Sequence, residues 1–238
     1  MATSYDSWHR GGDQRSAPAQ VRGRMLFLLL VAGLTPALLA TPSEDSLDRF
    51  LAHDTRQPHY RGTRHLEAEN GKRRGWLDIG TEYAPDTGFR YQITAQGGSD
   101  YIRKKVLKAV LDGERAVVAA GEDTRSSLAR TNYNFQTKGI DDDGLAPVLL
   151  VPRRKERALV AGLMLLRPDQ GELVRVEGRL AKNPSFWVRN VDIVRTYERI
   201  GGVVVPVAMD SKAHIRFFGA ATFRMTYSYA EINGQPVE

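Results

Sequence analysis

Residues 89–96 read FRYQITAQ, and this stretch decides the fold class. Apolar and polar residues alternate along it, so that Phe89, Tyr91 and Ile93 share one face of an extended chain. This alternation predicts a β-strand with one buried face. The apolar face must be covered by another element of the protein.

Further strand-like stretches lie on both sides of this one. Residues 60–69 and 74–83 precede it and are separated from each other by a turn, which predicts an antiparallel meander. After residue 132 almost the whole chain is extended and is broken by short turns such as Gly201-Gly202. The strands predicted in that part are residues 132–138, 146–151, 158–166, 173–180, 188–200, 203–209, 213–218 and 222–232.

A long helix is predicted between the two groups of strands. Residues 99–121 begin at Ser99, a residue type that caps helices, and carry apolar residues at helical spacing. Gly113 falls on this apolar stripe, so we expect the helix to approach the sheet closely there. A shorter helix is predicted at residues 43–52, before the first strand.

These elements predict a mainly β (α+β) fold. We expect a single curved antiparallel sheet or half-barrel of about eleven strands, with the long helix on its concave side. Residues 41–238 are expected to form one domain, because about 200 residues are enough for a single hydrophobic core without covalent cross-links.

The first forty residues carry a different signal. Residues 25–40 hold no charge, follow Arg22 and Arg24, and end in a small residue, as in a secretory signal peptide. A membrane span is the weaker alternative, because it needs about 20 apolar residues and this stretch contains Pro36. We therefore expect a signal peptide at about residues 21–40 after a disordered extension, and a secreted, periplasmic protein that is soluble after cleavage.

The chain has no cysteine, which excludes disulfides, thiolate metal sites and a cysteine nucleophile. It also lacks the cysteine that carries the lipid of bacterial lipoproteins, so we expect it not to be lipidated. The net charge is +6, and it is +4 without residues 1–40, which hold four basic and two acidic residues. A charge this small does not require a nucleic-acid partner, and none is expected.

The order of these elements resembles the lipoprotein-localisation (LolA/LolB) fold and the related N-terminal domain of RseB-type periplasmic regulators. The resemblance rests on the helix between the early and late strands and on residues 60–63, 132–135, 149–153 and 171–173. It implies a non-enzymatic, cofactor-free carrier whose apolar cavity binds the acyl chains of lipids or lipoproteins, as in outer-membrane lipoprotein sorting. The alternative is a protein-interaction or sensor module that docks an envelope membrane-protein partner.

Two groups of residues are candidates for binding. Aromatic and apolar side chains, mainly on the third and last strands, could line a cavity or could equally form an ordinary core. A basic cluster at a hairpin could contact lipid headgroups or a partner, or could be a solvated loop. The cavity candidates are Trp76, Phe89, Tyr91, Ile93, Phe217, Phe223, Met225 and Tyr227, and the basic cluster is Arg153, Arg154, Lys155 and Arg157.

No catalytic or metal site is predicted. The histidines within residues 53–65 have Arg61 and Arg64 as neighbours, which disfavour a bound cation. Residues 141–144 read DDDG and lack the alternating oxygen ligands of a calcium loop, so a solvated turn is expected. No nucleophile elbow, phosphate loop or dinucleotide-binding motif occurs.

Overall fold

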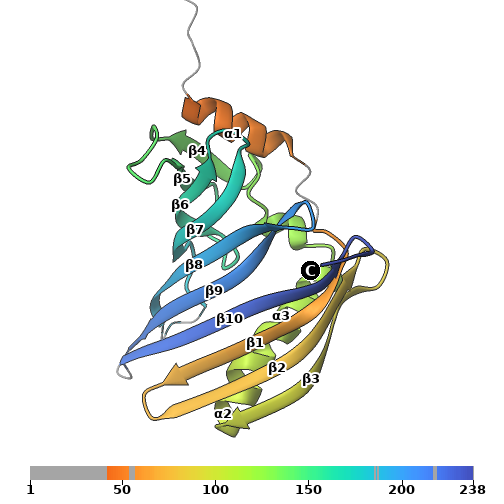
Figure 1. The fold of residues 1–238 in the computed structure, drawn as a ribbon. Helices are drawn as coiled ribbons and strands as arrows, with labels where there is room; N and C mark the ends of the chain where they lie inside the picture. Colours follow the sequence, from red (N-terminus) through yellow and green to blue (C-terminus); the bar gives the residue numbers. More distant parts are fainter. Residues whose placement is uncertain (1–41, 54–56, 185, 187, 217–218, 238) are drawn as a thin grey trace, which may run out of the picture. The chain divides into compact units, whose positions relative to one another are not determined.

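The computed structural model describes residues 42–53, 57–184, 186, 188–216 and 219–237. The predicted signal peptide and the candidate residue Phe217 lie outside this part of the chain and stay predictions. Within it, eleven antiparallel strands form one open sheet (Figure 1), which confirms the predicted fold class as an open sheet and not a closed barrel.

The strands follow the predicted stretches closely. They are β1 (Tyr60–Asn70), β2 (Arg73–Ala84), β3 (Gly88–Gly98), β4 (Tyr133–Thr137), β5 (Ala146–Pro152), β6 (Val160–Arg167), β7 (Glu172–Leu180), β8 (Val188–Ile200), β9 (Val203–Ile215), β10 (Gly219–Ile232) and β11 (Gln235–Pro236). The two strands predicted at 203–209 and 213–218 are one strand, β9. Asp210 and Lys212 do not end it, because they pair with Arg224 and Thr222 of β10 and continue the ladder.

The strand order is β3-β2-β1-β10-β9-β8-β7-β6-β5-β4, with β11 paired to β10. Both predicted meanders are present, and β1 joins them by pairing with β10, with Leu66 opposite Met225. As a result β3 and β4, which are neighbours in sequence, occupy opposite edges of the sheet. The chain between them must cross the sheet, and it does so largely as helix.

Helices cover the two halves of the sheet separately. The first, α1 (Pro42–Ala52), contacts β4 to β7. The second is 20 residues long and consists of α2 (Asp100–Ile102), a π-helical turn (Arg103–Leu107) and α3 (Lys108–Ala119), packed against β1, β2 and β3 (Figure 1). A short 3₁₀ turn (Asp123–Ser126) follows it.

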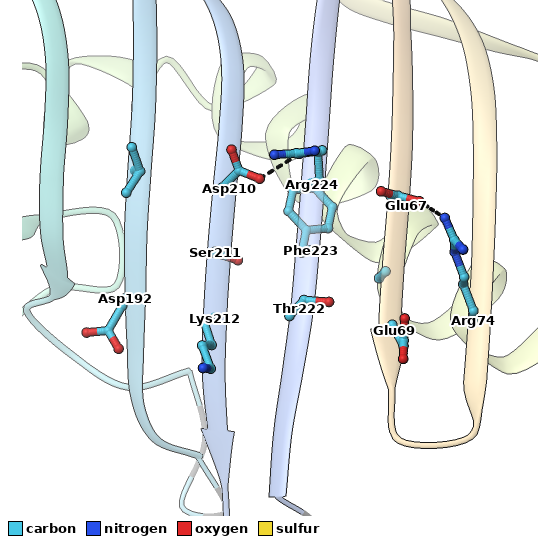
Figure 2. A pocket seen from close by; sticks show the side chains of 12 residues that line it. Glu67, Glu69, Arg74, Asp192, Asp210, Ser211, Lys212, Thr222, Phe223 and Arg224 are labelled. Atoms are coloured by element: carbon cyan, nitrogen blue, oxygen red, sulfur yellow. Dashed lines mark hydrogen bonds and ion pairs between the residues drawn. The ribbon is translucent and has the colours of Figure 1, made fainter.

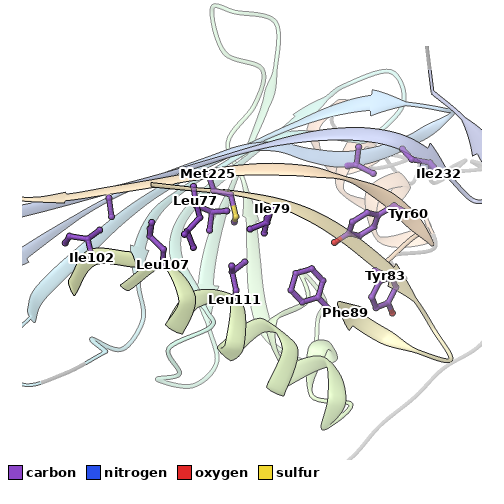
Figure 3. Packing of buried hydrophobic residues seen from close by; sticks show 13 residues of the cluster. Tyr60, Leu77, Ile79, Tyr83, Phe89, Ile102, Leu107, Leu111, Met225 and Ile232 are labelled. Carbon is purple, nitrogen blue, oxygen red and sulfur yellow. The ribbon is translucent and has the colours of Figure 1, made fainter. Parts of the chain in front are cut away.

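Both helices pack on the same face of the sheet, which we call the inner face. Cross-strand partners point to the same side of a sheet, and one such row crosses both halves. The row runs Val176, Arg195, Met209, Met225, Leu66, Leu77 from β7 to β2. It begins in a core beneath α1 and ends in a core beneath the long helix, shown in Figure 3.

The long helix turns a different stripe toward the sheet than the sequence predicted. Ile102, Leu107 and Leu111 are fully buried, whereas Gly113 is exposed, and a Cβ added there would meet no atom within 4 Å. The predicted close approach at Gly113 is therefore wrong. The cause is the π-helical turn, which inserts an extra residue into one turn and rotates the following residues relative to a 3.6-residue period.

This assignment of faces predicts opposite effects for two substitutions in α3. Leu111→Ala should lower the free energy of unfolding by about 2–5 kcal/mol, because it leaves a cavity in the core. Gly113→Ala should raise it by up to about 1 kcal/mol through helix propensity. Denaturant unfolding midpoints measure both values. Equal destabilisation by the two variants would mean that the helix is turned the other way.

Candidate functional site

The inner face holds most of the predicted cavity residues. Six of the described candidates pack on or within the core beneath the long helix, on β3 and β10. They are Phe89, Tyr91, Ile93, Phe223, Met225 and Tyr227. Phe89 and Met225 are almost fully buried in a packed core (Figure 3), whereas the other four are partly buried and lie against it. Tyr91 donates a hydrogen bond to Asp112 of α3 at 2.7 Å, which ties β3 to the helix.

Trp76 lies on the opposite, outer face of the sheet. Its cross-strand partner is Glu67, which in turn pairs with Arg224, and its ring stacks on His65 with centroids 6.0 Å apart. Its neighbours in β2, Gly75 and Leu77, take the buried positions. Trp76 is therefore not part of the predicted cavity lining, because the alternation of β2 directs it outward.

The outer face carries a shallow, charged depression of about 460 Å³. Figure 2 shows ion pairs that join charged side chains of neighbouring strands across it. Arg224 donates to Asp210 at 2.7 Å, and Arg74 donates to Glu67 at 2.6 Å. Arg74 thereby lowers the pKa of the Glu67 carboxyl. Such a surface is suited to water and offers little to an acyl chain.

A buried arginine is the main polar feature of the inner face beneath the helix. Arg64 of β1 has a side chain only 3% exposed, and both of its terminal nitrogens bind Glu114 of α3, at 2.7 and 3.0 Å. The guanidinium also donates to the Tyr60 hydroxyl. Its carbon lies 4.7 Å from the ring centres of both Phe89 and Tyr227, within cation–π range.

Tyrosines surround this ion pair and remain neutral. Burial raises the pKa of Tyr60 to about 12, although Arg64 acts in the opposite direction. Burial also raises the pKa of Tyr227 and of Tyr229. The phenol groups are therefore available as hydrogen-bond donors at neutral pH.

A second arginine lies on the inner face between the two cores. Arg195 of β8 stands in the row between Val176 and Met209. Its terminal nitrogen approaches the sulfur of Met209 at 3.7 Å, and its Nε is inaccessible to solvent and has no hydrogen-bond partner among the described residues. Tyr197, two residues along β8, lies beside the guanidinium and raises its pKa.

Arg64, Glu114 and Arg195 were not among the binding residues predicted from the sequence. The sequence does contain a sign that the two arginines are buried, because residues two apart in a strand point to the same face. Arg64 is two residues from Leu66, and Arg195 is two residues from Ile193, and both of these apolar residues are buried. A charged residue on the apolar side of a strand is unusual, because burying a charge is costly unless it is paired.

The predicted basic cluster lies in the loop between β5 and β6, and its side chains have separate contacts. Arg153 donates to the Tyr133 carbonyl at 3.3 Å, and Arg154 pairs with Glu156 at 2.8 Å. Lys155 and Arg157 are exposed and make no ion pair with any described residue. A role of this loop in binding headgroups or a partner stays a prediction.

Within the part of the chain that the structure describes, no group of three or more histidine, aspartate or glutamate side chains is arranged to hold a metal ion. Among the helices of that part of the chain, none combines the length and the apolar character needed to cross a membrane.

No family model and no curated protein matches the chain. Solved structures that match the chain include a DUF1329 family protein from Desulfovibrio piger, with TM-score 0.37 and 10% identity over 79% of this chain and 92% of that one. A LolA superfamily protein, NE2245 from Nitrosomonas europaea, gives a TM-score of 0.35 and 11% identity over 79% of this chain and 92% of that one. The MucA/MucB complex of Pseudomonas aeruginosa gives a TM-score of 0.26 and 13% identity over 82% of this chain and 98% of the matched chain. All three TM-scores are below 0.5, so neither a family nor a ligand or partner of this chain is inferred from these structures.

The buried ion pair predicts a large effect for one conservative substitution. Glu114→Gln should cost about 3–5 kcal/mol of stability, because it leaves the Arg64 charge buried without its carboxylate. Glu122→Gln is the matched control, because Glu122 forms an exposed pair with Arg125 that contributes at most about 1 kcal/mol. Thermal and denaturant unfolding measure both. A Glu114→Gln protein as stable as the control would contradict the buried pair.

The raised pKa of Tyr60 predicts a loss of stability in alkali. Its folded pKa of about 12 lies above the ordinary value of 10.0, so its contribution is fully present below pH 10 and is lost as the pH rises toward 12. Unfolding midpoints across this range, with absorbance titration of the phenolate, measure the effect. Tyr60→Phe should make the decline shallower, and an unchanged slope would exclude Tyr60 as its source.

Proposed function

We propose that the protein is a non-enzymatic binder or carrier of apolar ligands, such as the acyl chains of lipids or lipoproteins. The observation that carries the proposal is the division of the inner face into two separately covered cores. Between them, apolar and aromatic side chains of β8 to β10 are only partly buried. We call these residues the central strip: Tyr197, Met209, Phe223 and Tyr227.

The central strip suits a chain-like ligand for a simple energetic reason. Each methylene group moved from water onto an apolar surface contributes about 0.8 kcal/mol, so an acyl chain gains affinity without an elaborate set of polar contacts. Tyr197 packs against one core and Met209 against the other. A ligand lying along the strip would therefore contact both halves of the sheet.

The cellular setting is part of the same proposal. The uncharged residues 25–40, with arginines before them, support export through a signal peptide and release into the periplasm without a lipid anchor. A carrier of acyl chains would meet its ligands at the envelope membranes.

One observation favours the alternative of an interaction module that docks an envelope protein. The long helix exposes three apolar side chains, Tyr101, Val110 and Val117, which are 52%, 38% and 40% exposed. Apolar side chains of this size at the surface are typical of a protein contact. Occupancy of this helix side by a partner is compatible with the same fold.

Lipid extraction of the purified protein, followed by mass spectrometry, separates the two proposals. A co-purifying amphiphile supports the carrier. Titration with a fluorescent acyl probe should then saturate, and Met209→Gln should weaken probe binding about tenfold, because it places a polar amide on the central strip.

Thr226→Gln is the matched control for this substitution. Thr226 is an exposed residue on the outer face of β10, so this variant should bind the probe like the wild type. Thermal melting checks that both variants fold. A wild-type protein that carries no amphiphile and never binds the probe would defeat the carrier and leave the interaction module.

A further inference from the structure

We propose that Arg195 binds the anionic headgroup of the ligand, a carboxylate or a phosphate, at the centre of the inner face. This inference rests on the proposed function and names its substrate class: an amphiphile with one negatively charged group and an acyl chain lying on the central strip.

The position of Arg195 is the first support. It lies on the inner face in the row between Val176 of the core beneath α1 and Met209 beside the other core. Its residue surface is partly exposed, whereas its Nε is fully enclosed. A charged group is thus held at the point where neither helix covers the sheet.

The charge balance of the inner face is the second support. Arg64 is neutralised by Glu114, which binds both of its terminal nitrogens. No carboxylate of the described residues forms an ion pair within 4.0 Å of Arg195, although Glu114 interacts with it electrostatically. Its hydrogen-bonding neighbours are the Tyr197 hydroxyl and the Met209 sulfur, a weak acceptor. A guanidinium in such a place favours an anion, because a carboxylate or phosphate accepts several of its N–H groups at once.

Arginines on the outer face provide the contrast. Arg74, Arg179 and Arg224 each donate to a carboxylate within 3.0 Å. Their charges are already matched by cross-strand partners, so they offer no comparable site. Arg195 differs from them in having an apolar neighbour on both sides in the row and no ion pair within 4.0 Å among the described residues.

The Tyr197 hydroxyl completes the proposed headgroup site, because it lies beside the guanidinium as a hydrogen-bonding neighbour. Tyr227 of β10 and Glu114 of α3 interact with Arg195 electrostatically. Burial raises the pKa of Tyr227, so this phenol stays protonated and can donate to an oxyanion. A headgroup held here would leave its chain in contact with Met209 and Phe223 on the central strip.

The test compares compounds that share a dodecyl chain and differ in headgroup. Isothermal titration of the purified protein with dodecanoate and dodecyl phosphate should give affinities about tenfold or more above those of dodecanol and dodecyltrimethylammonium. Arg195→Gln should remove this preference and leave the affinity for dodecanol unchanged. Arg195→Lys should restore part of it, because the charge is kept while the fork of donors is lost.

Arg179→Gln is the matched control, since it removes an arginine from the outer face of the neighbouring strand β7. It should bind all four compounds like the wild type, and thermal melting establishes that each variant is folded. Titration with acetate and inorganic phosphate distinguishes the source of the anion. If the wild type binds inorganic phosphate and Arg195→Gln does not, the site also accepts free anions that carry no acyl chain.

Equal affinity of the wild-type protein for dodecanoate and dodecanol would overturn the anion site while leaving the proposed function in place. Binding of none of the dodecyl compounds would instead overturn the proposed function. The same preference for anions in Arg195→Gln as in the wild type would exclude Arg195 as its source.

Discussion

The ion pair between Arg64 and Glu114 is the constraint on which the arrangement of the inner face depends. A buried guanidinium must have its carboxylate, and here that carboxylate comes from the long helix. The pair therefore fixes α3 against β1, the strand that joins the two meanders by pairing with β10. On the inner face, the long helix packs against β1 to β3 and α1 packs against β4 to β7. The centre of this face, at β8 to β10, is therefore left to Arg195 and the central strip.

Much of the sheet could be predicted because strand alternation is a local property. The alternation of residues 89–96 and the turn residues between strands place most strand limits within a few residues. The pairing of β1 with β10 could not be derived in this way, because it joins residues about 160 apart in the chain and depends on the whole sheet. The helix stripe was misplaced for another reason: the π-helical turn at Arg103–Leu107 breaks the period that the prediction assumed.

The candidate site was predictable in its apolar part and not in its polar part. Parity along β3 and β10 correctly brings Tyr91, Ile93 and Met225 to one face, whereas Trp76 was included for its aromatic character against the parity of β2. Arg64 and Arg195 would be expected at the surface because they are charged, whereas the pairing of the strands places both on the inner face. The signal peptide and a domain boundary near residue 41 lie outside what the structure describes and stay predictions.

The central claim, that a ligand lies on the inner face between the two cores, can be tested by methyl NMR. The described residues contain three methionines: Met164 in the core beneath α1, Met225 beneath the long helix, and Met209 on the central strip. Titration of methyl-labelled protein with a nitroxide-labelled fatty acid should broaden the Met209 signal well before the other two. Equal broadening of all three signals, or a Met209 signal that does not change at saturation, would contradict the account.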